Sequence, residues 1–218
     1  TPDPSTLPDP VARTRSPAYD DQREMILAHA ADLFARRGYP ATSMNQLAEA
    51  CGLSKPTLYH YYRDKYALLV QIAEGHVGRL AELVAEIEAE GLPARPRLHR
   101  LIIRFVQEYA GAQNAHRVLT EDVRFLEEAD RERILVTERR VIDGFARALG
   151  ELRPDLDAAR LAVPVSMLLF GMINWMFTWL RPDGSLDHEM MAPIVADLFL
   201  GGLPHVSVPV PPPRGDTP

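Results

Sequence analysis

The segment from Thr42 to Tyr62 concentrates hydroxyl, ammonium, imidazole and phenol groups, which can donate hydrogen bonds to phosphates and base edges. Within it the small residue Ala48 precedes Gly52, and the apolar Leu58 follows. Two short helices can cross steeply where a small residue lies at their contact and a glycine accepts the left-handed turn between them. The spacing predicts a helix-turn-helix whose second helix enters the major groove of double-stranded DNA.

The second of these helices is expected to begin at a capping serine. Ser54 directly precedes Lys55, Pro56 and Thr57, which would form the first helical turn. A proline is tolerated there because the first amide hydrogens of a helix have no helical acceptor, and a serine side chain can accept one of them. Ser54 is therefore a candidate DNA-binding residue together with the turn that it caps.

The remaining candidate DNA contacts follow from the faces of this second helix. The residues expected at base edges and nearby phosphates share the face opposite Leu58: Lys55, Pro56, Tyr59 and His60. Lys55 is the candidate donor to guanine. Thr57 and Tyr61 share an adjoining face and are expected at the DNA backbone. The alternative for the two tyrosines is an ordinary solvated surface.

The first helix of the motif offers a second type of contact at its start. Thr42 and Ser43 are expected to present hydroxyls and free amides at a helix N-terminus, an arrangement that suits a phosphate. The alternative is a plain helix cap, and both roles are compatible.

Charge is distributed unevenly along the 218-residue chain. The formal net charge is −6, yet residues 19–66 carry six arginines and lysines against six aspartates and glutamates. The excess of acid therefore lies beyond residue 66, which predicts that a few well-placed cations provide phosphate affinity and that the acidic part does not touch DNA.

Several classes of function find no support in the sequence. A single cysteine, Cys51, excludes an intramolecular disulfide framework and a cysteine-rich zinc module. The histidines show no paired metal-ligand spacing, and neither a phosphate-binding glycine loop nor a Gly-x-Ser-x-Gly elbow is present. No apolar run reaches membrane-spanning length and no export signal stands out. We expect a cytoplasmic protein that is not an enzyme and has no metal, cofactor or membrane partner.

Apolar residues recur at steps of three and four, so the sequence predicts an all-α protein. Helices are expected at about 20–37, 64–90, 95–112, 115–128, 130–150, 156–180 and 187–201, with Pro164 and Pro193 bending the last two. Residues 1–18 and 204–218 are rich in proline and are expected to be disordered, with Arg13 and Arg15 of the arm near DNA. Residues 19–66 would form a DNA-binding domain and residues 67–203 a larger helical domain.

The N-terminal part resembles the DNA-binding domain of the tetracycline-repressor (TetR) family of bacterial regulators over residues 23–69. The resemblance rests on Ile26, Leu27, Ala30, Leu33, Phe34, Gly38, Tyr39, Thr42, Ser43, Leu47, Ala48, Gly52, Leu53, Ser54, residues 57–62, Lys65, Leu68 and Leu69. It departs from the family at Tyr62, Tyr66 and His29.

This resemblance implies a homodimer of all-α subunits, each with a three-helix head and a larger domain for ligand binding and dimerisation. A small-molecule effector would change the spacing of the two heads and release a palindromic operator. Lys65 resembles the family's phosphate-binding lysine. The helix at 64–90 would couple effector site and head.

The C-terminal part also resembles TetR-family regulators that respond to acyl-CoA thioesters, through residues 171–184 and 198–203. The analogy implies acyl-pocket walls at Phe105, Tyr109, Phe125 and Trp175, and contacts to the CoA phosphates from Arg104, Arg117 and Arg124. Asn174 is a further candidate ligand contact, because a buried amide needs a hydrogen-bond partner. Core and dimer packing is the alternative for the apolar residues, and surface ion pairing for the arginines.

Three other functions remain as alternatives. An enzyme would need catalytic motifs that the sequence lacks. A nucleoid or complex-assembly protein would have a solidly packed body, whereas an effector site needs a cavity. Within the regulators, a multidrug-efflux repressor is the main rival: scattered aromatic residues and a buried acid would favour it, and a cationic pocket mouth would favour an acyl-CoA sensor.

Overall fold

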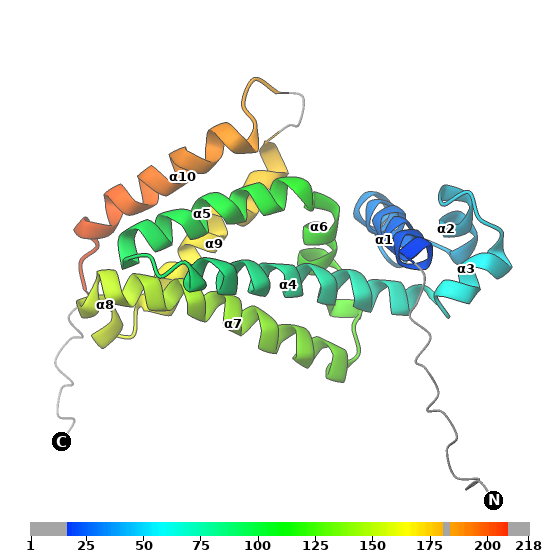
Figure 1. The fold of residues 1–218 in the computed structure, drawn as a ribbon, viewed down its shortest axis with the longest axis horizontal. Helices are drawn as coiled ribbons and strands as arrows, with labels where there is room; N and C mark the ends of the chain where they lie inside the picture. Colours follow the sequence, from blue (N-terminus) through cyan, green and yellow to red (C-terminus); the bar gives the residue numbers. More distant parts are fainter. Residues whose placement is uncertain (1–16, 181–183, 209–218) are drawn as a thin grey trace, which may run out of the picture.

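The computed structural model describes residues 17–180 and 184–208, and over these residues its regular structure is entirely helical (Figure 1). The all-α prediction is therefore confirmed. Residues 1–16, with Arg13 and Arg15, and residues 209–218 were expected to be disordered, and both segments lie outside the described residues. Among the described helices, none is both long and apolar enough to cross a membrane.

A small head lies at one end of the molecule (Figure 1). It consists of α1 (Pro17–Arg37), α2 (Met44–Ala50) and α3 (Lys55–Tyr61), followed directly by α4 (Lys65–Ala89). Helix α1 begins three residues earlier than expected, because Pro17, Ala18 and Tyr19 belong to it. Its end at Gly38, where φ is +81°, follows the prediction.

Helix α4 leaves the head and runs along the larger body (Figure 1). Asp64 caps its N-terminus by accepting a hydrogen bond from the amide of Ala67 at 2.8 Å. Its buried face contributes to two apolar clusters, with Leu68, Leu69 and Ile72 in the head cluster and Leu83 and Ile87 in the body cluster. The same rigid element therefore anchors both cores.

The body is built from the remaining helices. These are α5 (Ala94–Gly111), α6 (Gln113–Glu121), the 3-10 turn η1 (Val123–Phe125), α7 (Glu128–Leu152), α8 (Pro154–Ala158), α9 (Ala162–Trp179), α10 (His188–Gly202) and the 3-10 turn η2 (Leu203–His205). Helices α4, α5, α7 and α9 pack around one core, with α10 packed on α5.

Two expected helices are broken in the structure. The helix expected at 115–128 ends at Glu121, and η1 then places Phe125 against the ring of Tyr39 in the head. The helix expected at 156–180 is interrupted by Arg160, whose φ of +59° cannot continue a right-handed helix. Pro164 therefore lies in the first turn of α9, where its missing amide hydrogen costs no helical bond, and the bend expected there was wrong. Pro193 lies inside α10 as expected.

The start of the expected disordered tail is held in place. Arg153 donates from Nη1 to the carbonyl of Leu203 and, at 2.9 Å, from Nη2 to the carbonyl of Val206. Residues 204–208 consequently belong to the folded body rather than to a disordered tail.

Helices α4 and α7 approach closely at Gly144. A methyl group at this position would lie 2.3 Å from Cγ1 of Val84, well inside van der Waals contact. We expect Gly144→Ala to lower the free energy of unfolding by about 1–3 kcal/mol, because one helix must shift. Chemical denaturation followed by circular dichroism measures the loss. The double variant Gly144→Ala/Val84→Ala should recover much of the lost stability. A Gly144→Ala variant as stable as wild type would show that α4 and α7 can move apart without a cost in free energy.

Candidate nucleic-acid interface and ligand cavity

The turn between α2 and α3 has the geometry that the sequence predicts. Gly52 adopts φ of +63°, and the amide of Leu53 donates to the carbonyl of Ala48 at 2.9 Å. Ala48 is buried at the contact, and Leu58 is 0% exposed. These three residues fix the angle between the two helices and leave the opposite face of α3 open.

The first turn of α3 is held by Ser54. Its Oγ accepts from the amide of Thr57 at 3.2 Å and lies 2.7 Å from the Thr57 hydroxyl. Pro56 occupies the first turn as expected. The capping role of Ser54 is therefore confirmed, and the cap keeps the N-terminus of the helix ordered.

Most of the candidate DNA contacts on α3 are exposed and share one surface. The exposed members are Ser54, Lys55, Pro56, Thr57, Tyr59 and His60. The Lys55 ammonium lies 5.9 Å from the centre of the Tyr59 ring, so both side chains occupy the same patch. Tyr61 differs, because it is half-buried against the ring of Tyr19 at 4.9 Å. Tyr19 thus supports the recognition helix from α1.

An open hollow lies between the start of α2 and the exposed face of α3. Ser43, Asn45, Lys55 and Tyr59 are among the residues that line it. Hydroxyl, amide, ammonium and phenol donors therefore converge on one concave surface, which suits a phosphate backbone. Asn45 was missed from the sequence, where it has no feature that separates it from other exposed helical residues.

Of the two residues expected to contact phosphate before α2, Thr42 and Ser43, only Ser43 presents its side chain to solvent. Ser43 is the N-cap of a capping box: its Oγ accepts from the Gln46 amide at 3.3 Å, and its own amide donates to Gln46 Oε1 at 2.9 Å. The expectation for Thr42 was wrong, because its hydroxyl donates to the Gly38 carbonyl at 3.0 Å and its amide to the Tyr39 carbonyl at 3.3 Å. Thr42 closes the turn after α1 and is 2% exposed.

Lys65 also differs from the role that the family resemblance implies. Its ammonium donates to the carbonyls of Tyr39, Pro40 and Thr42 at 3.0, 3.2 and 3.1 Å, and it lies 4.5 Å from the centre of the Tyr39 ring. All three donors of an ammonium are thereby used inside the protein. In this structure Lys65 joins the start of α4 to the loop before α2 instead of presenting its charge to a phosphate.

The head and the body are joined by polar contacts around Tyr66. Its hydroxyl donates to Asp130 Oδ2 at 2.5 Å and accepts from the amide of Glu127 at 2.8 Å. These contacts tie the start of α4 to the start of α7. Helix α6 also packs against both α1 and α4. A shift of α6 or α7 would therefore reach the head directly.

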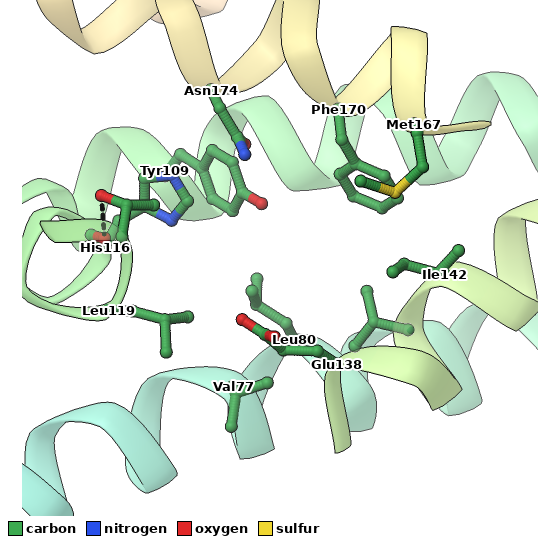
Figure 2. A pocket seen from close by; sticks show the side chains of 12 residues that line it. Val77, Leu80, Tyr109, His116, Leu119, Glu138, Ile142, Met167, Phe170 and Asn174 are labelled. Atoms are coloured by element: carbon green, nitrogen blue, oxygen red, sulfur yellow. Dashed lines mark hydrogen bonds between the residues drawn. The ribbon is translucent and has the colours of Figure 1, made fainter. Parts of the chain in front are cut away.

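The body contains a cavity of about 150 Å³ between α4, α5, α6, α7 and α9 (Figure 2). Its lining residues are Val77, Leu80, Tyr109, His116, Leu119, Thr120, Glu138, Val141, Ile142, Met167, Phe170 and Asn174. A cavity of this size holds a single aromatic ring. Its presence favours an effector-binding protein over a solidly packed one.

Tyr109 and His116 form one wall of the cavity, and a second buried imidazole, that of His76, contacts His116 outside the lining. The rings of Tyr109 and His116 stack at 3.9 Å between centroids, and His76 Nε2 lies 3.2 Å from His116 Nδ1. Burial lowers the pKa of His76 to about 4 and, with the neighbouring His76, that of His116 to about 3. Both imidazoles are therefore neutral at neutral pH, and the wall carries no positive charge.

The opposite walls carry two hydrogen-bond acceptors. The Glu138 side chain of α7 points into the cavity, across from Asn174 of α9 (Figure 2). Burial raises the pKa of the Glu138 carboxyl. Asn174 Oδ1 is buried and has no hydrogen-bond partner among the described residues. Glu138 was missed from the sequence, because an acid on an amphipathic helix normally faces solvent.

Only some of the ligand-binding residues predicted from the sequence line the cavity. Tyr109 and Asn174 line the cavity. Phe105 is 0% exposed and packs edge-to-face on Phe145 in the core, so the expectation of a pocket wall was wrong there. Phe125 contacts Tyr39 of the head instead.

The arginines expected at CoA phosphates lie on the surface. Arg104 is 3.8 Å from Glu86, Arg117 pairs with Glu121 at 2.9 Å, and Arg124 lies over the Phe125 ring at 4.9 Å. No described lysine or arginine lines the cavity.

A surface groove adjoins the cavity between α6 and α9. Thr120 and Asn174 line both, and Arg117 and Trp175 lie in the groove. The groove is therefore a path from solvent to the cavity. Trp175 is 67% exposed, which corrects its assignment as an inner pocket wall.

Helices α9 and α10 carry apolar side chains that the subunit leaves exposed. The largest of them are Val163, Met167, Leu168, Trp175 and Trp179 on α9, and Met190, Ile194 and Leu198 on α10. Leu168 is 69% and Leu198 66% exposed. We call these eight residues the apolar stripe. Exposed apolar side chains gathered on neighbouring helices are typical of an interaction surface.

Comparison with known proteins gives two family matches. Residues 26–72 match the family described as "Bacterial regulatory proteins, tetR family", and residues 91–203 match "Tetracyclin repressor-like, C-terminal domain". Together these matches cover the helix-turn-helix and all the helices that enclose the cavity except the part of α4 that contains Val77 and Leu80.

Individual relatives agree with these matches. The chain is 28% identical over 195 residues to the HTH-type transcriptional repressor KstR2 of Rhodococcus jostii, covering 84% of this chain and 93% of the relative. It is 25% identical over 185 residues to the fatty acid metabolism regulator protein of Bacillus subtilis, covering 82% and 93%. A crystal structure of a TetR-family regulator from Bordetella parapertussis superimposes with a TM-score of 0.80 at 35% identity, covering 87% and 99%.

Proposed function

Because the chain belongs to the TetR family of bacterial transcriptional regulators, we propose that it is a homodimeric repressor that binds a palindromic operator and is released by a small-molecule effector. The observation that carries this proposal is the pairing of an exposed recognition helix with an effector-sized cavity, linked by α4 and α6. Binding to chromosomal DNA places the protein in the cytoplasm.

Recognition of the operator's base sequence is assigned to the exposed face of α3. A helix N-terminus in the major groove presents its first turn to base edges, and here that turn carries Lys55, with Tyr59 and His60 one turn on. Ser43 and Asn45 of α2 and Ser54 and Thr57 of α3 are assigned to phosphates. Thr42 and Lys65, whose side chains donate to backbone carbonyls, hold the loop that leads into this surface.

We expect Lys55→Ala to weaken operator binding about tenfold or more while leaving the thermal midpoint unchanged, because Lys55 is exposed and its loss removes a base or phosphate contact. Fluorescence anisotropy on the DNA upstream of the protein's own gene measures the affinity. Arg100→Ala is the matched control, since Arg100 lies on α5 in the body and pairs with Glu90 at 3.7 Å. Equal affinity of the Lys55 variant and wild type would remove Lys55 from the interface.

Dimerisation is assigned to the apolar stripe of α9 and α10. A palindromic operator needs one recognition helix on each half-site, about one turn of DNA apart, so one subunit is insufficient. Burial of the stripe against a second copy removes these apolar side chains from water. The C2 symmetry of such a pair makes the same helices the surface on both subunits.

The effector is assigned to the cavity, and a compact hydrophobic molecule fits it better than a large polar one. The cavity of about 150 Å³ is mostly apolar, contains the acid Glu138 and is lined by no described lysine or arginine. A buried acid and aromatic walls are the features expected of an efflux-type regulator. The effector class proposed first is therefore a small drug-like ligand.

An acyl-CoA thioester is the second candidate. One relative is named as a regulator of fatty acid metabolism, and the groove with Arg117 could hold the chain beyond an acyl group in the cavity. The Arg117–Glu121 pair would first have to open.

One titration tests the repressor function and separates the two effector classes. Operator DNA bound to the protein is titrated with acyl-CoA thioesters, the matching free acids and compact aromatic compounds, and release is followed by anisotropy. Release by aromatic compounds alone supports the first class, and release by a thioester but not by its acid supports the second. Absence of binding to any DNA from the region of the gene would contradict the repressor function itself.

A further inference from the structure

We infer that the cavity selects a protonated amine attached to a single aromatic ring, with Glu138 as the residue that recognises the ammonium group. This inference rests on the proposed function, in which the cavity is the effector site, and it specifies the ligand's charge and hydrogen bonding.

The position of Glu138 is the first argument. Its carboxyl group points into the cavity (Figure 2), and it makes no ion pair or hydrogen bond with any described residue, although α7 forms surface pairs such as Arg139–Glu132. Glu138 is partly buried, and a carboxylate with reduced access to water is stabilised by an opposite charge or by hydrogen-bond donors. The direction of its pKa shift agrees, since burial alone raises it and no cation counteracts that effect.

Asn174 supplies the second argument. Its Oδ1 is buried at the cavity without a hydrogen-bond partner, on the wall across from Glu138 (Figure 2). Two acceptors without donors therefore face one small space. A buried acceptor costs free energy until a donor reaches it. An ammonium group carries three donors and one positive charge, so it matches the acceptor that also carries charge, Glu138.

The remaining walls fit an aromatic ring. The faces and edges of Tyr109, His116 and Phe170 surround the same space, together with aliphatic side chains. The negative face of an aromatic side chain also attracts a nearby cation. The volume of about 150 Å³ is sufficient for a single aromatic ring.

Anionic ligands are disfavoured by the same residues. A carboxylate ligand would face Glu138, and burial keeps the imidazole of His116 and that of its neighbour His76 neutral, so no described side chain that lines the cavity offers a positive charge. Arg117 lies outside it, in the adjoining groove, where it is paired with Glu121. Like charges brought together in a medium of low dielectric repel strongly.

The test compares three probes of the same shape and different charge: benzylammonium, benzyl alcohol and benzoate. Dissociation constants come from the rise of the melting midpoint with probe concentration, measured on the full-length protein. We expect benzylammonium to bind about tenfold more tightly than benzyl alcohol, because charge-assisted hydrogen bonds are the stronger ones, and benzoate not to bind measurably.

Glu138→Gln keeps the shape of the side chain and removes its charge. We expect this variant to lose the preference for benzylammonium while binding benzyl alcohol within about twofold of wild type. Glu132→Gln is the matched control on the same helix, since Glu132 is exposed and pairs only with Arg139 among the described residues. The control should retain the full preference.

Several results would overturn the inference: equal binding of benzylammonium and benzyl alcohol by wild type, tighter binding of benzoate, no binding of any probe, or an unchanged preference in Glu138→Gln. Operator binding is measured separately on the ligand-free protein. If the ligand-free wild-type protein binds no operator, the proposed function is contradicted, whereas the measured charge preference of the cavity still stands.

Discussion

Replacing Leu168 with arginine is expected to convert the protein from dimers to monomers and to weaken operator binding by about a hundredfold or more. Leu168 is the most exposed large apolar residue described in the chain, at 69%, and it lies in the apolar stripe of α9. A guanidinium there would be buried against apolar side chains of the second subunit without a partner, which opposes association. Monomers then bind one half-site at a time.

Light scattering after gel filtration gives the mass of the assembly, and anisotropy gives the operator affinity. Val136→Arg is the control, because Val136 is an exposed apolar residue at 37% on α7, outside the stripe. The control should remain dimeric with full affinity. A Leu168→Arg variant that stays dimeric would place the subunit contact elsewhere.

Replacing Lys65 with alanine is expected to lower the free energy of unfolding by about 2–4 kcal/mol, since three carbonyl oxygens lose a charged donor. Denaturation followed by circular dichroism measures the loss. Arg63→Ala is the control: Arg63 is exposed and lies 3.2 Å from the half-exposed Asp64, so its removal should change stability by less than about 0.5 kcal/mol.

The two roles considered for Lys65 predict different results. A phosphate-binding lysine would leave stability intact on substitution and reduce the salt dependence of operator binding by about one charge. The structural role predicts a less stable head. Stability equal to wild type, combined with a smaller salt slope, would restore the phosphate contact.

The helix-turn-helix was the most predictable part of the molecule. Ala48, Gly52, Ser54 and Leu58 act through neighbours close in sequence, so local rules of helix contact, left-handed turns and capping suffice. Lys65 was misread because its acceptors lie 23 to 26 residues away in the preceding loop. Sequence spacing cannot show which distant side chain will donate hydrogen bonds to the carbonyls of a folded loop.

The cavity was only partly predictable, for a related reason. Helix α9 is apolar on almost every side, so its sequence does not reveal that Asn174 faces inward while Trp175 faces outward. Glu138 lies on a helix rich in surface ion pairs, and nothing local distinguishes it from Glu132. The space around it is created by five helices that meet only in the folded chain.

The three hydrogen bonds from Lys65 have a consequence for the operators that the protein can recognise. They bind the start of α4 to the loop that leads into α2, so the head cannot flex independently of its helix. In an effector-free dimer with one such head on each subunit, the distance between the recognition helices is therefore set by the positions of the two α4 helices. Inserting one base pair between half-sites moves them apart by about 3.4 Å and turns them by about a tenth of a revolution. Natural operators should therefore vary in their bases more readily than in the length of their central spacer.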